Sequence, residues 1–196
     1  MLMKRLVPIA ALLMLAAGPA IAHVGHGSTA SFTAGLGHPL GGLDHVTVMV
    51  LVGLWAGLKG GRALWVWPAT FVGVMLIGGI LGMEGVPLPF VEAAILASVV
   101  ALALLVALAV DLPVSVGAGL LALFALFHGH AHGTEVAGAL NGVEYMAGFA
   151  LATAALHLAG IGFALTMTHC SLRPAVRVVG ALCIPVAAAL YAGIFQ

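Results

Sequence analysis

The chain has 196 residues, of which 63% are hydrophobic and only 6% carry a charged side chain. Soluble domains have about half apolar and about a quarter charged residues, so this composition excludes a soluble globular protein and predicts an all-α integral membrane protein surrounded by lipid. The formal net charge is zero, so no excess of basic residues indicates nucleic acid as a partner. Two cysteines, Cys170 and Cys183, do not make a disulfide framework.

The first 22 residues have the pattern of a cleaved signal peptide. Lys4 and Arg5 precede a short apolar stretch, and Ala-Ile-Ala at 20–22 is typical of a cleavage site. An uncleaved anchor helix is the alternative. Cleavage would make His23 the new N-terminus on the outer side of the membrane. Residues 23–35, rich in Gly, Ser and Thr, are expected to form an extended periplasmic tail.

Six apolar runs follow, each near the ~20 residues that cross a bilayer core. We expect one transmembrane domain over residues 36–196, a six-helix bundle. Its spans are predicted at about 36–58, 63–81, 88–110, 114–132, 143–167 and 175–195. The first and fourth spans each open a three-helix half and run in opposite directions, which is compatible with a 3+3 inverted repeat.

The basic residues predict the orientation of these spans. With the mature N-terminus outside, the four Lys and Arg residues of the mature chain, Lys59, Arg62, Arg173 and Arg177, all fall inside. This distribution obeys the positive-inside rule. We therefore expect a multi-pass protein of a bacterial inner membrane with both mature termini in the periplasm.

The first of two histidine-rich segments, His-Pro-Leu-Gly-Gly-Leu-Asp-His at 38–45, opens the first span. His38 and His45 share a helix face, but on a straight helix seven residues separate them by about 10 Å along the axis. Pro39 and the two glycines at 41–42 permit local unwinding that would let the segment curl around an ion.

Asp44 lies in the same segment, within the predicted span. A carboxylate there costs roughly 2.5–3.5 kcal/mol on insertion scales, so it should face the bundle interior and have a partner. A structural Asp–His hydrogen bond is one interpretation and metal ligation the other. We favour His38 at the outer mouth, with Asp44 and His45 deeper.

The second segment, Phe-His-Gly-His-Ala-His-Gly-Thr-Glu at 127–135, ends the fourth span. His128, His132 and Glu135 are spaced i, i+4, i+7 and lie along one helix face, while His130 points roughly opposite. Two histidines at i, i+4 make a good chelating pair, and Glu135 could ligate or orient an imidazole. We expect His128 and His132 to complete the deeper site, and His130 to be either an accessory ligand or a surface residue.

Four further residues are weaker candidates. His23 and His26 could capture an ion, although a plain tail fits them equally well. Glu144 could add a ligand or cap the fifth span. His157, midway along that span, could be a relay or a hydrogen-bonded packing residue.

These ligand types define the class of ion. Imidazole and carboxylate suit Ni²⁺, Zn²⁺, Co²⁺ or Cu²⁺, and the lack of clustered Cys or Met argues against Cu⁺. The chain has no phosphate-binding loop of the Walker type, so it cannot itself use ATP. We expect a secondary transporter or facilitated channel with the divalent ion as substrate, no organic cofactor and no enzymatic activity.

The two segments resemble the signatures of the HupE/UreJ family, small bacterial membrane proteins implicated in nickel supply to hydrogenase and urease. The resemblance extends over essentially the whole mature chain. It implies Ni²⁺ uptake from periplasm to cytoplasm, with Co²⁺ or Zn²⁺ less favoured. The first segment is also similar to the H-x4-D-H signature of larger nickel/cobalt permeases, but its spacing here is H-x5-D-H. The residues that the family resemblance implies for nickel transport are His38, Asp44, His45, His128, His132 and Glu135.

Two other function classes remain open from the residues alone. One is a membrane-embedded metalloenzyme with a histidine-bound metal, for which the chain shows no nucleophile motif. The other is a haem-binding electron carrier with axial histidines on two helices. A visible absorption spectrum of the purified protein separates this second class from a transporter.

Overall fold

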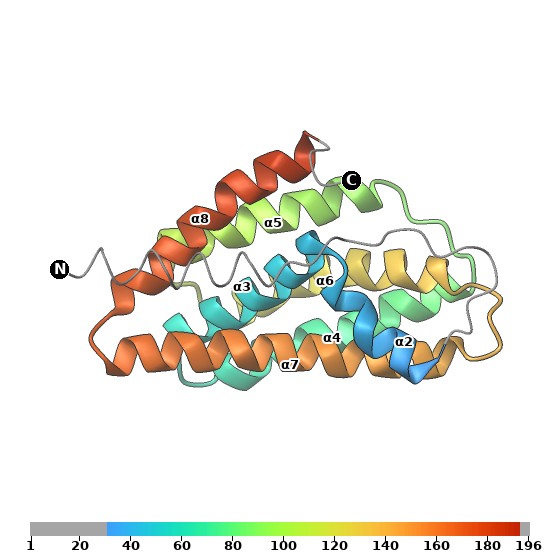
Figure 1. Ribbon diagram of the computed structural model, residues 1–196, viewed down its shortest axis with the longest axis horizontal. Coiled ribbons are helices and arrows are strands. Elements are labelled where there is room, and N and C mark those ends of the chain that lie inside the picture. Colours follow the sequence, from blue (N-terminus) through green and yellow to red (C-terminus); the bar gives the residue numbers. More distant parts are fainter. Residues whose placement is uncertain (1–30, 193–196) are drawn as a thin grey trace.

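The computed structural model describes residues 31–192, and every regular element in that part of the chain is helical. This confirms the all-α prediction there, while the predicted signal peptide, His23 and His26 lie outside the described residues. Figure 1 shows the helices as a bundle. In chain order the elements are α2 (Phe32–Gly37), the 3₁₀ turn η1 (His38–Leu40), α3 (Leu43–Lys59), α4 (Ala63–Met83), α5 (Val91–Ala107), α6 (Val114–Glu135), α7 (Gly142–His169) and α8 (Arg173–Tyr191).

Four helices, α4, α6, α7 and α8, are long and apolar enough to cross a membrane. The pair formed by Phe32–Leu40 and α3 would make a fifth span, bent by 83° at its break. Helix α5 is apolar and has 17 residues, at the short end of the range of about 17–25 that crosses a bilayer. The chain is therefore a multi-pass membrane protein, and the number of six spans stays a prediction.

Among the described residues, the first helix begins earlier than the first span that we predicted. Residues 32–35, expected in an extended tail, form the start of α2, because the side chain of Ser31 accepts a hydrogen bond from the backbone nitrogen of Ala34 at 3.2 Å. Helix α2 also packs against α7. A Cβ atom on Gly35 or on Gly148 would collide with the backbone of the facing helix, so the two glycines allow this contact. Tertiary packing thus orders a segment whose composition indicated a tail.

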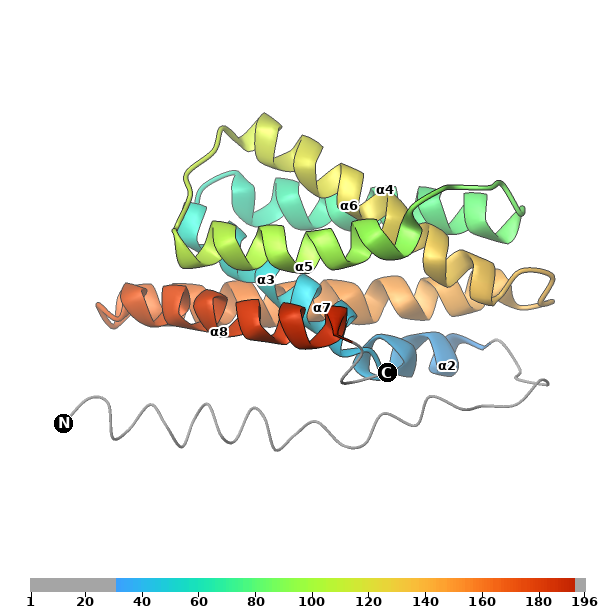
Figure 2. The same ribbon diagram turned by 90° about the horizontal axis from the view of Figure 1, so that it is seen from above.

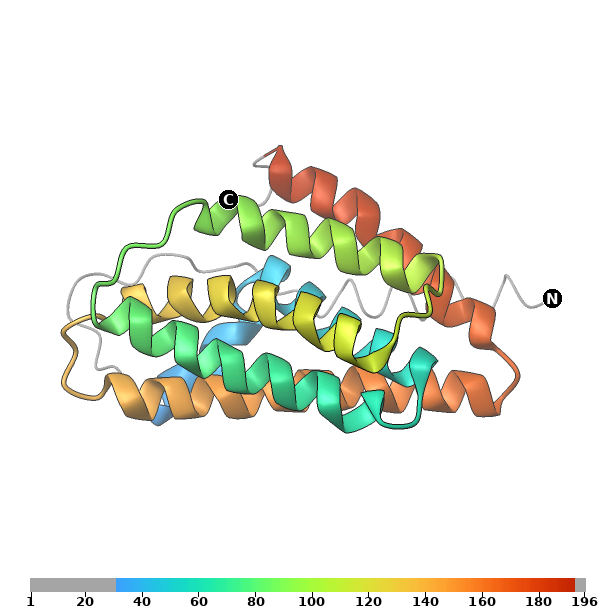
Figure 3. The same cartoon turned by 180° about the vertical axis from the view of Figure 1, so that it is seen from behind.

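Helix α3 is the central helix of the bundle. Residues 47–58 are buried apart from the half-buried Val50, and α3 contacts α4, α5, α7 and α8. Around it, α4 pairs with α6 and α5 with α8, an arrangement that Figures 2 and 3 show from two further sides. A helix with an apolar surface on all sides is stable in this position because no face of it meets water.

The basic residues gather at one end of the bundle, where α3 and α5 end and α8 begins. Lys59 forms an ion pair with Asp111, and the guanidinium of Arg173 donates to the carbonyl oxygen of Leu58 at 3.2 Å. Arg177 donates to the last carbonyl of α5 at 2.9 Å. We call this the basic end. The start of α3 and the end of α6, which carry the histidine segments, lie at the opposite end, the histidine end.

Glycines bring α4 and α6 into close contact. A Cβ atom on Gly129 would collide with the carbonyl of Met75, and one on Gly133 with the carbonyl of Gly79. Helices in lipid gain no hydrophobic free energy from associating, so dispersion between closely approaching backbones is what holds such a pair. The contact fixes the depth and rotation of the histidine-bearing end of α6.

Substitution of Gly129 by Ala should lower the free energy of unfolding by about 1–3 kcal/mol, because the added methyl overpacks the α4–α6 contact. Gly119 is the matched control, since it lies on the same helix and a Cβ there meets nothing within 4 Å. Gly119→Ala should be neutral or slightly stabilising. Thermal unfolding of the detergent-solubilised protein measures both, and equal midpoints would contradict the packing argument.

Candidate metal centre

A sharp bend places the two histidines of the first segment at different depths of the bundle. Pro39 lies in the 3₁₀ turn, and Gly42 has extended backbone angles (φ −103°, ψ 116°) that interrupt the helix before α3 starts. The chain direction changes by 83° at this break. Unwinding therefore occurs where the sequence permits it. His38 lies beside the end of α6, while His45 projects into the bundle.

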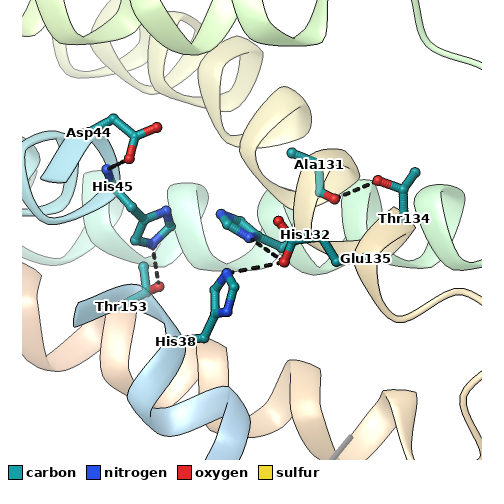
Figure 4. A network of polar contacts seen from close by, with 8 residues as sticks. All are labelled: His38, Asp44, His45, Ala131, His132, Thr134, Glu135 and Thr153. Carbon is teal, nitrogen blue, oxygen red and sulfur yellow. Dashed lines mark hydrogen bonds and ion pairs between the residues drawn. The ribbon is translucent and has the colours of Figure 1, made fainter. Parts of the chain in front are cut away.

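An outer cluster forms from His38, His132 and Glu135 (Figure 4). The Oε2 atom of Glu135 lies 3.1 Å from Nε2 of His38 and 3.4 Å from Nδ1 of His132. One ligand atom from each of the three residues lies within 4.8 Å of the others. Ligands around a first-row ion, with bonds of about 2.1 Å, lie about 3–4 Å apart, so a small inward movement would let all three bind one ion.

The imidazole rings continue inward from this cluster as a row of four. Ring centroids are 4.9 Å apart for His38 and His132, 5.0 Å for His132 and His45, and 5.6 Å for His45 and His128. Exposure decreases along the row, from 38% and 14% for the side chains of His38 and His132 to 2% and 1% for residues His45 and His128. The row therefore leads from the surface into the bundle core.

Hydrogen bonds orient the two buried rings. Nδ1–H of His128 donates to the carbonyl of Phe124 at 3.0 Å, which leaves the lone pair on Nε2. The Thr153 hydroxyl donates its proton toward Sδ of Met75, so its oxygen is free to accept a hydrogen bond. Nε2–H of His45 donates to this oxygen at 3.4 Å, which leaves the lone pair of the His45 ring on Nδ1. Neither lone-pair nitrogen has a hydrogen-bond partner among the described residues. Fixing one nitrogen so that the other can ligate is the usual arrangement of metal-binding histidines.

Helix α7 lines the opposite side of the row with residues at i, i+4 spacing. Tyr145 lies 5.6 Å from the ring of His38, and Phe149 lies 4.4 Å from His132 and 4.7 Å from His45, between ring centroids. Thr153 follows one turn later. Sequence reasoning missed these residues, because aromatic residues and a single threonine do not stand out in an apolar span. Their i, i+4 spacing with His157 was the available signal.

Asp44 is near the row but not in the outer cluster. Its Oδ1 atom accepts a hydrogen bond from the backbone nitrogen of His45 at 2.8 Å, in the first turn of α3. In Figure 4 its carboxylate lies apart from His38, His132 and Glu135, beside the backbone of His45. The structure therefore gives Asp44 a hydrogen bond at a helix start, where a negative charge is also favoured by the helix dipole.

The structure places the three accessory candidates that it describes, His130, Glu144 and His157, outside the row of four. His130 points away from the row, and its Nε2 contacts the carbonyl of Val86 at 2.7 Å, which ties α6 to the connection between α4 and α5. Glu144 is exposed at the start of α7 and is outside the outer cluster. His157 is fully buried on α7 and lies beyond the row of four.

The fold and the site define a class: a helical membrane protein with a row of imidazoles and one carboxylate at its half-exposed end, the donor set of a divalent first-row metal ion. The HupE / UreJ protein family model matches residues 11–190. The chain is also 51% identical over 147 residues to Protein HupE of Rhizobium leguminosarum bv. viciae, an alignment that covers 74% of this chain and 77% of the relative. The protein belongs to the HupE/UreJ family. No solved structure matches it.

Replacing Glu135 by Gln should weaken Ni²⁺ binding by about 10–100-fold, because the outer cluster loses its one anionic ligand and the partner of both rings. Equilibrium dialysis with nickel-63 on the detergent-solubilised protein measures the affinity. Glu144→Gln is the matched control, since it removes a carboxylate that is also exposed but lies outside the cluster. Unchanged affinity in Glu135→Gln would show that the cluster does not bind the ion.

Proposed function

We propose that this protein carries Ni²⁺ as its substrate from the periplasm to the cytoplasm, as a secondary transporter or facilitated channel. The observation that supports the proposal is the row of four imidazoles, in which exposure falls from 38% for the side chain of His38 to 1% for residue His128. A storage or structural site needs one closed coordination sphere. A series of adjacent donors at increasing depth suits passage, which needs several sites that bind well enough to admit the ion and weakly enough to release it.

The outer cluster is the proposed capture site. Glu135 supplies a negative charge at the mouth, which attracts a cation and offsets part of its loss of water. His132 belongs to this cluster and also lies 5.0 Å from the ring of His45. We infer that His132 passes the ion to His45 and His128, so that imidazole nitrogens replace water ligands one at a time.

The proposed ion is Ni²⁺, with Co²⁺ second. Imidazole and carboxylate ligands alone suit several divalent first-row ions, and membership of the HupE/UreJ family favours nickel among them. The close edge-to-face packing of the four rings, at centroid distances of 4.9–5.6 Å, favours single ions over a flat haem placed between two histidines.

Reconstituted wild-type protein should take up nickel-63 into liposomes, and His45→Ala should lower the initial rate by about tenfold or more, because the row loses the ring that links its outer and inner parts. Asp44→Asn should also reduce uptake: the amide oxygen can still accept from the His45 backbone, so any loss reports the missing charge. His130→Gln is the control, a buried histidine outside the row. Equal uptake by all four proteins would refute the role of the row, and no uptake by the wild type would refute transport itself.

The proposed orientation places the basic end in the cytoplasm, as the positive-inside rule requires. Cys170 is exposed at the end of α7, which lies at the basic end, and Cys183 is half-buried in α8. In a Cys183→Ser variant, a membrane-impermeant maleimide should therefore label Cys170 in inside-out vesicles and not in intact spheroplasts. The reverse pattern would invert the topology and the direction of uptake.

A further inference from the structure

His157 is a buried polar residue that the row of four does not include. It is 0% exposed, and neither of its ring nitrogens has a hydrogen-bond partner among the described residues. Buried polar groups are nearly always hydrogen-bonded, and a native exception calls for an explanation. If His157 only filled space, its two nitrogens would lower the stability of the fold, because burying them removes their hydrogen bonds to water without replacing them. An apolar side chain of similar size would fill the same space without this cost.

The position of His157 continues the row toward the basic end. It follows Thr153, the partner of His45, by four residues on α7, which is one turn or about 6 Å along the axis. Phe71 of α4 packs near both His157 and the buried end of the row: the ring centroid of Phe71 is 5.8 Å from that of His128 and 5.3 Å from that of His157. Phe71 is itself fully buried. One phenyl ring therefore packs near both the buried end of the row and the next imidazole.

We propose that His157 is a further metal ligand on the path, and that it receives the ion from His45 and His128 when the ring of Phe71 turns aside. The inference rests on the proposed function and assigns the next binding step of the same path. Neither nitrogen of His157 has a hydrogen-bond partner in the part of the chain that the structure describes, so either can present a lone pair without breaking a bond there. The ring of Phe71, which packs near both imidazoles, is the side chain that we place at the step between the two positions.

A thiolate at position 157 tests directly whether the ion reaches it. In a Cys170→Ser, Cys183→Ser background, His157→Cys incubated with Ni²⁺ in detergent should show a thiolate-to-nickel charge-transfer band. The same substitution at His130, a buried histidine that points away from the row, should show none. A band in both variants, or in neither, overturns the proposal, because a packing role for His157 predicts no difference between the two positions.

Transport supplies the second readout. His157→Leu should lower nickel-63 uptake into proteoliposomes by about tenfold or more, while Ni²⁺ binding at the outer cluster changes by less than about twofold. Uptake by His157→Leu within twofold of wild type overturns the proposal. If the leucine variant unfolds, His157→Gln decides in its place, since it keeps polarity and similar volume.

The two tests separate this inference from the proposed function. Absence of nickel uptake by the wild-type protein would refute transport and leave the charge-transfer measurement in detergent unaffected. Wild-type uptake that is sensitive to His45→Ala but insensitive to His157→Leu would keep the transport proposal and remove His157 from the path.

Discussion

The break between η1 and α3 is the constraint on which the rest of the site depends. A continuous helix would hold His38 and His45 about 10 Å apart along one axis, with both rings on one line. The 83° bend separates their roles, since it lays His38 against the end of α6 and turns His45 into the core. The bend is held from outside by α2, which packs on α7 where Gly35 and Gly148 let the backbones meet. The site is thus assembled by packing of a segment that carries none of its inner ligands.

Charge and depth vary together along the row. The one carboxylate of the outer cluster, Glu135, is 46% exposed, where water still reduces the cost of its charge. Farther in, the ligands are the neutral imidazoles of His45 and His128. Burying them costs less desolvation free energy than burying carboxylates. Neutral ligands do not cancel the charge of a divalent ion, so a deep site made of them binds it less tightly than one with an anion. Under the proposed function, this difference favours release from the inner positions.

Part of this structure could be predicted from the sequence, and the remainder depends on contacts between helices. Apolar runs and the i, i+4, i+7 spacing of His128, His132 and Glu135 placed the helices and the shared face of α6. Local patterns carry no information on which helix faces that row, so the contribution of Phe149 and Thr153 from α7 was missed. Asp44 shows the same limit: its spacing from His38 does not indicate that its oxygen meets the His45 backbone.

The two ends of the bundle differ in how they are closed. The histidine end leaves His38 and Glu135 partly exposed, whereas toward the basic end two buried indole rings, Trp55 and Trp67, stack at 4.1 Å between centroids. Each indole N–H also donates to a backbone carbonyl at the connection between α5 and α6, at 2.9 Å. Under the proposed function, an exit route between α3 and α4 would part these rings and replace both hydrogen bonds, each of which is costly to leave unmade in a membrane interior. Under the proposed function, the described arrangement suits entry of the ion from the histidine end, and release along that route would need a second arrangement of α3 and α4 at the basic end.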